Sequence, residues 1–303
     1  MINILTSILM PIFIQIIIGF IIQKKFKLDI KTLSRVQIYV LVPALIFIKF
    51  YTSELSGSFM LQIFGFTVLL FILLMVASTV GAKLLKMSKK KEKVFVNAVV
   101  LRNQGNYCIP LFTLLYLNTG NSIALSIHMI VLLTTNLLLN TVGLYNASSG
   151  SYSGKEAILK VFKLPMIYTI IFGVIFKSFG ITVPIPILNT LEIMGNGVVA
   201  LALITLGAQL AETKIAFGDK TIPIAAMMRL VLSPLLAFLL VILFGIEGTM
   251  AQVLIIGASA PTAVNSVLLA IEFDGDAAYA SQTVFLTTLM SIVTVTTTII
   301  LVM

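Results

Sequence analysis

The sequence predicts an all-α polytopic membrane protein with ten transmembrane helices, arranged as two inverted five-helix repeats in which the fourth and ninth helices are broken and crossed. Three observations lead to this fold class. Of the 303 residues, 59% are hydrophobic and only 10% are charged, whereas an average soluble domain is about 25% charged. Ten apolar stretches have the length of a membrane span, and two of them carry clusters of polar residues and proline at matching places.

The spans follow from length and hydropathy. A helix needs about 20 mostly apolar residues to cross roughly 30 Å of hydrocarbon, and the mean hydropathy of the whole chain is +1.12. The sixth predicted span is the shortest. The ten spans cover residues 5–23, 32–50, 59–84, 94–117, 123–144, 164–180, 187–211, 221–245, 249–271 and 277–302.

Basic residues are distributed unequally between the two sides of the predicted bundle. Sixteen of the 20 lie in connections on one side, two (Lys49 and Lys177) lie on the other, and Arg102 and Arg229 fall within spans. Positively charged connections stay in the cytoplasm, so we expect a multi-pass protein of the plasma or inner membrane with both termini outward. No basic residue precedes the first span, and we expect no cleaved signal peptide. The sixteen are Lys24, Lys25, Lys27, Lys31, Arg35, Lys83, Lys86, Lys89, Lys90, Lys91, Lys93, Lys155, Lys160, Lys163, Lys214 and Lys220.

The longest polar connection lies near the midpoint of the chain and divides the spans into five and five. We therefore predict a first repeat over residues 1–145, a cytoplasmic linker over 146–163 and a second repeat over 164–303. An odd number of spans in each half means that the second half enters the membrane upside down relative to the first. Inverted repeats of this kind are typical of secondary transporters.

A weak internal similarity supports the repeat. The first span aligns with the sixth so that Pro11 matches Pro165 and Gly19 matches Gly173, both at an offset of 154 positions. Apolar sequences align easily by chance, so the main evidence for the repeat is the odd number of spans in each half, and the alignment is secondary.

The fourth and ninth spans are too polar in their middles for lipid-facing helices. Proline lacks an N–H group and clashes with the preceding turn, so we predict that both helices unwind just before their prolines and cross, with Leu111 and Thr262 beginning new half-helices. The N-terminus of a helix attracts anions. The alternative is that the prolines only kink continuous helices. The residues expected to line a binding site are Asn103, Asn106, Ser259, Thr262 and Asn265, with Gly105, Pro110 and Pro261 at the crossing.

Two arginines within spans need an explanation, because a mid-helix arginine costs roughly 2.5–3.5 kcal/mol on insertion scales. Arg102 lies beside Asn103 in the broken fourth span. It is either the counter-charge of an anionic substrate or a side chain that snorkels to the interface. For Arg229, in the eighth span with no break of its own, we expect snorkelling.

Several classes of activity are excluded or disfavoured. One cysteine and one histidine exclude a disulfide scaffold and a cysteine zinc cluster. Neither HExxH nor GxSxG occurs, and we predict no catalytic residue, no metal site and no cofactor. The net charge of +9 serves membrane orientation rather than nucleic-acid binding. Neither broken span has Asp or Glu in its polar middle, which argues against tight coupling to sodium or protons, although backbone carbonyls and asparagine leave sodium binding open.

At these residues the chain resembles the auxin efflux carrier family, which includes bacterial malate and malonate carriers and the plant PIN-FORMED proteins. The family's fourth helix has a pattern close to G-N-T-G-F-x-G-I-P-L. Here NQGNYCIPL keeps the family residues at five positions, while Cys108 replaces the usual glycine and Arg102 is a departure. The stretches MGNGVVALALITLGAQLAE and APTAVNSVLLAIEFDGDAAYASQTVFLTTLMSIVT are also similar to the family. The five positions are Asn103, Gly105, Ile109, Pro110 and Leu111.

The resemblance implies ten helices, crossed fourth and ninth helices, an elevator-like movement, a homodimer and a small organic anion, such as a carboxylate, as cargo. We therefore predict a carrier of small carboxylates that works by efflux. A sodium-coupled organic anion symporter of the bile-acid type is the alternative. A membrane-embedded enzyme and a non-transporting receptor are the rivals from other classes.

Overall fold

The structure, a computed structural model, is built of helices and describes residues 5–52, 55–117, 119, 121, 123–148, 162–213 and 218–303. Within this part of the chain, the one strand-like feature is an isolated antiparallel bridge between Arg102 and Thr262. The all-helical prediction is confirmed. Most of the predicted linker lies outside the described residues, as do the basic residues Lys155, Lys160 and Lys214.

Seven helical segments are long and apolar enough to cross a membrane. Large apolar side chains on their outer faces are more than half exposed, among them Ile17, Leu61, Ile193 and Leu243, as expected of helices that face lipid. The protein is therefore a multi-pass membrane protein. The segments are Leu5–Phe26 (η1 Leu5–Leu9, α2 Met10–Phe26), Ile30–Tyr51 (α3 Ile30–Val36, η2 Gln37–Leu41, α4 Val42–Tyr51), α5 Gly57–Leu84, Ile123–Ala147 (α8 Ile123–Leu138, η3 Leu139–Gly143, α9 Leu144–Ala147), α12 Ile185–Ala211, Thr221–Leu243 (α13 Thr221–Met227, η4 Met228–Leu232, α14 Ser233–Leu243) and α17 Ala277–Val302.

Five shorter helices complete the described fold. Helix α11 spans Pro165–Ser178. The other four form two successive pairs, each interrupted by a non-helical stretch. They are α6 Lys89–Val100 with α7 Cys108–Tyr116, and α15 Gly248–Ala258 with α16 Asn265–Glu272.

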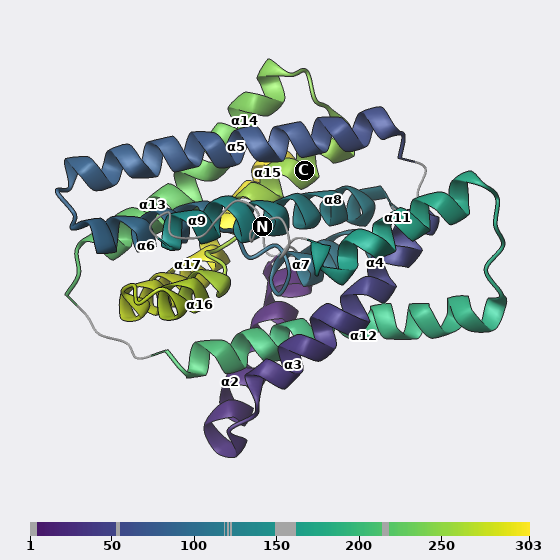
Figure 1. The fold of residues 1–303 in the computed structure, drawn as a ribbon, viewed down its shortest axis with the longest axis horizontal. Coiled ribbons are helices and arrows are strands. Elements are labelled where there is room, and N and C mark those ends of the chain that lie inside the picture. The colour runs from purple at the N-terminus through teal and green to yellow at the C-terminus, as the bar shows by residue number, and fades with distance from the viewer. Residues whose placement is uncertain are drawn as a thin grey trace.

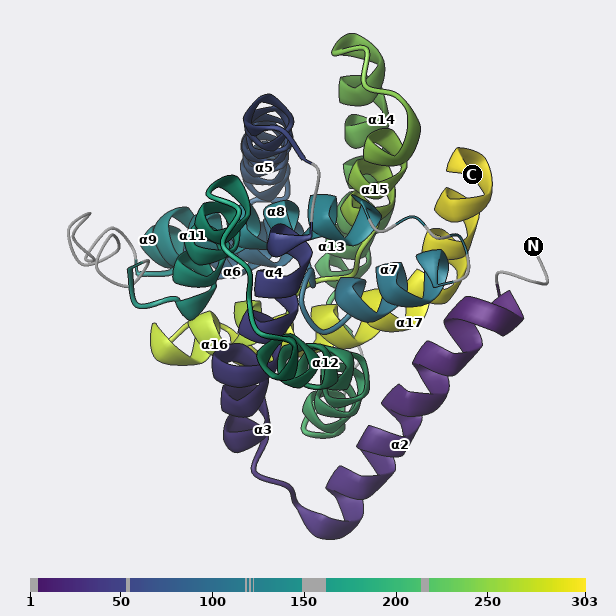
Figure 2. The same cartoon turned by 90° about the vertical axis from the view of Figure 1, so that its right-hand side faces the viewer.

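Three of the long helices run along the longest axis of the molecule, horizontal in Figure 1, and are seen nearly end-on in Figure 2: α5, α8 and α12. The lysine-rich turn between α5 and α6 lies at the left end of Figure 1, and the connection between α11 and α12 lies at the right end. The broken pairs lie between the long helices, and seven consecutive residues of α6, from Val94 to Val100, are buried. The breaks are therefore shielded from lipid by surrounding helices.

Four five-residue π-helical turns interrupt the long segments, and prolines explain three of them. Pro11, Pro43 and Pro234 follow η1, η2 and η4 by two residues. A proline donates no hydrogen bond to the carbonyl four residues earlier, so the preceding turn widens. Each wide turn rotates nearby side chains around the helix axis. Gln37 lies in η2 and Arg229 in η4, and both side chains point toward the broken helices.

Glycines allow two helix pairs to approach closely. A Cβ atom on Gly19 of α2 would collide with the backbone of Ile204 in α12. A Cβ on Gly173 of α11 would lie 2.9 Å from Phe50 Cβ and 3.2 Å from the carbonyl oxygen of Phe47 in α4. Helix α2 therefore packs tightly on α12, and α11 on α4, at backbone-to-backbone distance.

Candidate binding site at two broken helices

The two interrupted helix pairs meet at their breaks. The backbone N–H of Asn103 donates to the carbonyl of Pro261 at 2.9 Å, and the N–H of Ala263 donates to the carbonyl of Leu101 at 2.9 Å. These two hydrogen bonds flank the antiparallel bridge between Arg102 and Thr262. The prolines therefore do more than kink continuous helices, because residues 101–107 and 259–264 leave the helices, and residues 101–103 pair with residues 261–263.

The predicted starts of the second half-helices were wrong. Helix α7 begins at Cys108, three residues before Leu111, and α16 begins at Asn265, three residues after Thr262. Pro110 lies in the first turn of α7, where a missing N–H leaves no intrahelical bond unmade. Pro261 lies within the paired stretch, where its carbonyl accepts from Asn103. The pairing between the breaks, rather than each proline alone, decides where helix resumes.

A side chain of each break also caps the C-terminal end of the helix that leads into the other break. Gln104 Nε2 donates to the carbonyl of Gly257 near the end of α15 at 2.8 Å, and Thr262 Oγ1 donates to the carbonyl of Ala98 near the end of α6 at 2.8 Å. The last carbonyls of a helix have no intrahelical partner. The crossing therefore satisfies buried backbone groups reciprocally.

Arg229 lies at this crossing, and the prediction that it snorkels to the interface was wrong. Its side chain is 0% exposed. Nη1 donates to the carbonyl of Val99 at 2.5 Å, and Nη2 donates to the carbonyl of Ala258 at 2.6 Å and to the hydroxyl of Ser233. The C-terminal ends of helices carry partial negative charge, and α6 and α15 both end here. The guanidinium therefore binds both ends at once.

A cavity of about 120 Å³ lies beside the first break. Four of the six predicted substrate residues line it, together with the predicted crossing residue Gly105. The remaining wall comes from α3, η2, α4, α7, α8, η3, α11, α12, the second break and the start of α16. The four predicted residues are Arg102, Asn103, Asn106 and Asn265.

The cavity wall is rich in hydrogen-bond donors that have no partner in the protein. Arg102 is 4% exposed, and its Nε and Nη2 atoms have no hydrogen-bond partner; neither has Nδ2 of Asn103 or the hydroxyl of Thr135. No aspartate or glutamate is among the described residues that line the cavity. A buried cation without a counter-charge is costly, and an anion in the cavity would supply both charge and hydrogen-bond acceptors.

Two of the cavity residues that were not predicted from the sequence hold Asn106 in place. Gln37 Nε2 donates to Asn106 Oδ1 at 2.8 Å, and Asn106 Nδ2 donates to Gln209 Oε1 at 3.3 Å. Asn106 is thus held between η2 and α12. The available signal was an amide in each of two largely apolar spans, but helical phase alone did not show that both face the break.

Ser259 and Thr262 lie apart from the cavity. Both are 0% exposed. Ser259 Oγ donates to the carbonyl of Ile256 at 2.7 Å, and the backbone N–H of Thr262 donates to Thr287 Oγ1 at 3.1 Å. Their roles as substrate ligands stay predictions; in the structure the hydroxyl of Ser259 donates to a carbonyl of α15 and the hydroxyl of Thr262 to a carbonyl of α6.

His128 and Cys108 complete the surroundings of the first break. His128 Nε2 is 2.9 Å from the carbonyl oxygen of Gln104, and its ring lies 4.7 Å from that of Phe112. Cys108 is buried in the first turn of α7. In the described part of the chain, no three His, Cys, Asp or Glu side chains gather where they could hold a metal ion.

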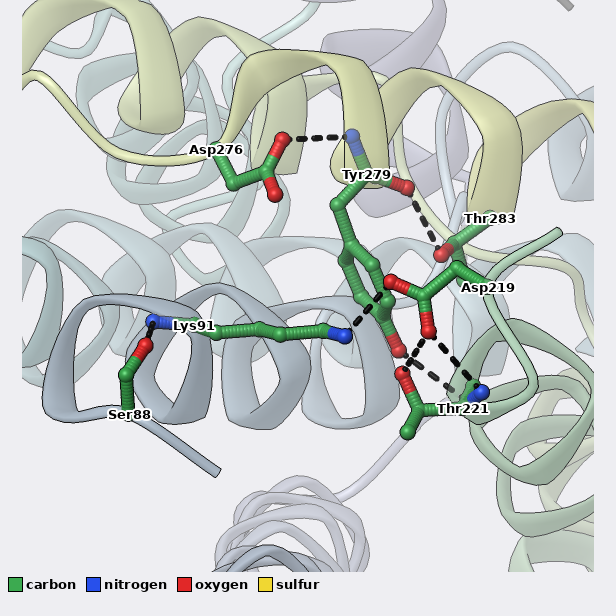
Figure 3. Close-up of polar contacts among 7 residues, drawn as sticks. All are labelled: Ser88, Lys91, Asp219, Thr221, Asp276, Tyr279 and Thr283. Carbon is green, nitrogen blue, oxygen red and sulfur yellow. Dashed lines mark hydrogen bonds and ion pairs between the residues drawn. The ribbon is translucent and has the colours of Figure 1, made fainter. Parts of the chain in front are cut away.

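A polar cluster fixes the lysine-rich end of the first broken helix (Figure 3). Lys91 Nζ in α6 donates to Asp219 Oδ2 at 2.5 Å, and Asp219 Oδ1 accepts from the hydroxyl of Thr221 at 2.6 Å. Tyr279 in α17 donates its hydroxyl proton to the carbonyl of Thr221 at 3.1 Å. Asp276 caps α17 by accepting from the N–H of Tyr279. The cluster therefore ties α6 to α13 and α17.

Comparison with known proteins points to membrane transport. A family described as "Membrane transport protein" matches residues 3–299. An uncharacterized transporter of Methanocaldococcus jannaschii is 25% identical over 272 residues, which cover 88% of this chain and 87% of the relative. An uncharacterized transporter of Methanothermobacter thermautotrophicus is 25% identical over 299 residues, which cover 95% of each chain.

Proposed function

The chain belongs to this family of membrane transport proteins, the auxin efflux carrier family, and from that premise we propose that it carries small organic anions, carboxylates such as malate or malonate, across the cell membrane. The family points to a transporter rather than to an enzyme. One observation carries the choice of an anion: Arg102 and Asn103 line the cavity beside the first break and have buried donors without a partner, while no described residue of its wall is a carboxylate.

The charge balance of the cavity supports this cargo. One carboxylate of the cargo would accept a hydrogen bond from Asn103 Nδ2, and Thr135 and Asn265 also line the cavity. The Arg102 guanidinium would donate charge-assisted hydrogen bonds to a second carboxylate on the same molecule, and such bonds are about twice as strong as neutral ones. Within the proposal, Asn106 is positioned for the substrate by Gln37 and Gln209, while Ser259 and Thr262 shape the second break.

Helix packing supports the proposal of two inverted repeats, residues 1–145 and 164–303 joined by the linker 146–163. In this reading α11 and the two broken pairs add three spans to the seven long ones, which makes ten. The equivalent glycines Gly19 and Gly173 then make equivalent contacts, the first span on the seventh and the sixth on the second. The bridge between Arg102 and Thr262, 160 positions apart, falls where a two-fold axis relating the halves would pass.

We propose that transport occurs by an elevator-like movement. Helices α2, α4, α11 and α12 form one tightly packed group, and the broken pairs with α5, α8, α14 and α17 form the other; the cavity lies between them. With the lysine-rich ends in the cytoplasm and both termini outward, an interior-negative potential favours exit of an anion by about 2.3 kcal/mol per charge per 100 mV. Efflux then needs no coupled ion. A homodimer is expected from the family resemblance.

Counterflow of labelled malate into proteoliposomes tests the proposal, with mono- and dicarboxylates as competitors and with sodium present or absent. Sodium-independent exchange that particular acids block would support an anion carrier. Exchange only in the presence of sodium would move the protein to a symporter of the bile-acid type. Saturable binding without flux would instead indicate a receptor, and no binding or flux across the acid panel would contradict the proposed cargo.

A further inference from the structure

A second cavity lies along the same wall as the first, toward the opposite end of the helices. Its volume is about 330 Å³. Helix α4 contributes Val42 to the first cavity and Lys49 to the second, and α7 contributes Ile109 to the first and Thr113 to the second. Helices α8 and α12 also line both cavities. At a rise of 1.5 Å per residue, about one turn of α7 separates the two cavities.

Lys49 is the basic residue of this second cavity. It is half-buried, and no hydrogen bond or ion pair of its ammonium group is found among the described residues. The polar residues around it include Asn196, while Tyr116 is already bonded to Gln252. Glu192 on α12 interacts with Lys49 through charge but forms no ion pair within 4.0 Å, and its side chain is exposed. The positive charge is therefore only partly compensated.

We propose that Lys49 and the cavity around it form a second, low-affinity docking site for the same class of small carboxylate, occupied before or after the anion reaches Arg102. This inference rests on the proposed function. The two sites share one interface, each offers a single incompletely compensated cation, and the apolar side chain of Leu45 is buried in the wall of the second cavity. On this account, Lys49 sets the apparent affinity at the face opposite the lysine-rich ends.

The experiment compares Lys49→Gln with Lys177→Gln, a matched control on the same side whose lysine is exposed and lines no part of the cavity. Half-saturation for labelled malate is measured separately from each face, in proteoliposomes of determined orientation. Lys49→Gln should raise half-saturation about five- to tenfold at the Lys49 face alone, since it removes one charge interaction. Glu192→Gln should lower it at that face, because it removes the competing carboxylate. Lys49→Arg should retain most of the wild-type affinity.

The outcomes separate this inference from the proposed function. An equal change at both faces, or no change in Lys49→Gln beyond that in Lys177→Gln, would overturn the docking site while leaving the carrier intact. The same effect in Lys49→Arg as in Lys49→Gln would also overturn it, because the charge would then be irrelevant. If the wild-type protein shows no saturable exchange with any carboxylate of the panel, the proposed function fails and the docking site fails with it.

Discussion

The two helix breaks pair with each other through their backbones but differ in the chemistry of their side chains. In the first, Arg102 and Asn103 present donors without partners to a cavity; in the second, Ser259 and Thr262 are bonded to backbone groups. At the bridge itself, Arg102 stands opposite Thr262. The crossing therefore forms because both helices are broken, and the candidate binding site lies at the first break because Arg102, rather than a threonine, stands at the bridge there.

The difference is also energetic. Thr262 adds a hydrogen bond to the end of α6, which stabilises the fold by about 1 kcal/mol. Arg102 is buried with two nitrogen atoms unpaired, a state that costs stability. Only the first break has this cost, so we expect the first break to bind cargo and the second break to serve stability.

The largest effect is expected from Arg229→Met, which acts on both breaks equally. It leaves the carbonyl of Val99 without its side-chain donor and the carbonyl of Ala258 with only the Ser233 hydroxyl. The free energy of unfolding should fall by about 2–5 kcal/mol, since each hydrogen bond from a charged donor contributes roughly 1.5–3 kcal/mol. Cys108, the single cysteine, is buried, so a thiol-reactive dye reports unfolding in detergent. An unchanged free energy of unfolding in Arg229→Met would contradict the bridging role. The stability of Arg229→Lys should lie between those of the wild type and Arg229→Met.

Asn103→Ala and Asn265→Ala should each abolish transport and leave folding nearly intact. Asn103 Nδ2 has no protein partner to lose, and Asn265 is exposed at the cavity edge. Flux of labelled malate in proteoliposomes is compared with the unfolding temperature of the same preparations. Normal transport by both variants would place the site elsewhere.

Arg102→Ala should weaken dicarboxylates more than monocarboxylates. Loss of a charge-assisted hydrogen bond costs about 1.5–3 kcal/mol, which raises half-saturation for a dicarboxylate roughly 10- to 100-fold. Competition by matched mono- and dicarboxylates in the counterflow assay measures the difference. An equal loss of both classes, or a large drop in unfolding temperature, would identify a structural arginine.

Thr262→Val is the reciprocal change in the second break and should affect stability alone. It removes the hydrogen bond to the carbonyl of Ala98 and should lower the free energy of unfolding by about 1–2 kcal/mol. Half-saturation for malate should stay within about twofold of the wild-type value, a range well below 1 kcal/mol. A selective loss of affinity with unchanged stability would show that the second break also contacts cargo.

The sequence was sufficient for the features that depend on composition and local chemistry. Apolar length predicted the long helices, and clustered polar residues with proline predicted both breaks and four of the residues that line the cavity. The sequence was insufficient for features that depend on contacts between helices far apart in the chain. Arg229 has no break in its own helix, and only the packing of η4 against the ends of α6 and α15 shows its role.

Helical phase explains the other omissions. Gln37 and Gln209 are amides in largely apolar helices, and the wide turn of η2 before Pro43 decides that Gln37 reaches Asn106. The starts of α7 and α16 were misplaced because the pairing of the two breaks, which brings together residues 160 positions apart, fixes them. Such a contact leaves no local trace in the chain.

The smallest effect is expected at the end of the first broken helix, far from the site, where the cluster of Figure 3 gives a pH dependence. Burial opposes ionisation of Asp219, but hydrogen bonds from Lys91 and Thr221 and the charge of Lys91 outweigh it and hold the pKa of Asp219 below its ordinary value of 3.8. A lowered folded-state pKa stabilises the protein above the unfolded value, and this contribution disappears as pH falls through the folded value. Asp219→Asn should therefore lower stability by about 1 kcal/mol or less at neutral pH and by progressively less below pH ~4.

Thermal unfolding of wild type and Asp219→Asn between neutral pH and pH ~3.5 measures this difference. Asp274→Asn is the matched control, because it removes the carboxylate of the exposed Lys90–Asp274 pair next along the same helix and should change little. A gap between wild type and Asp219→Asn that persists undiminished at the lowest pH would mean that the contact with Lys91 acts through shape rather than charge. A gap that closes would show that the first broken helix is anchored electrostatically at one end and by backbone pairing at the other.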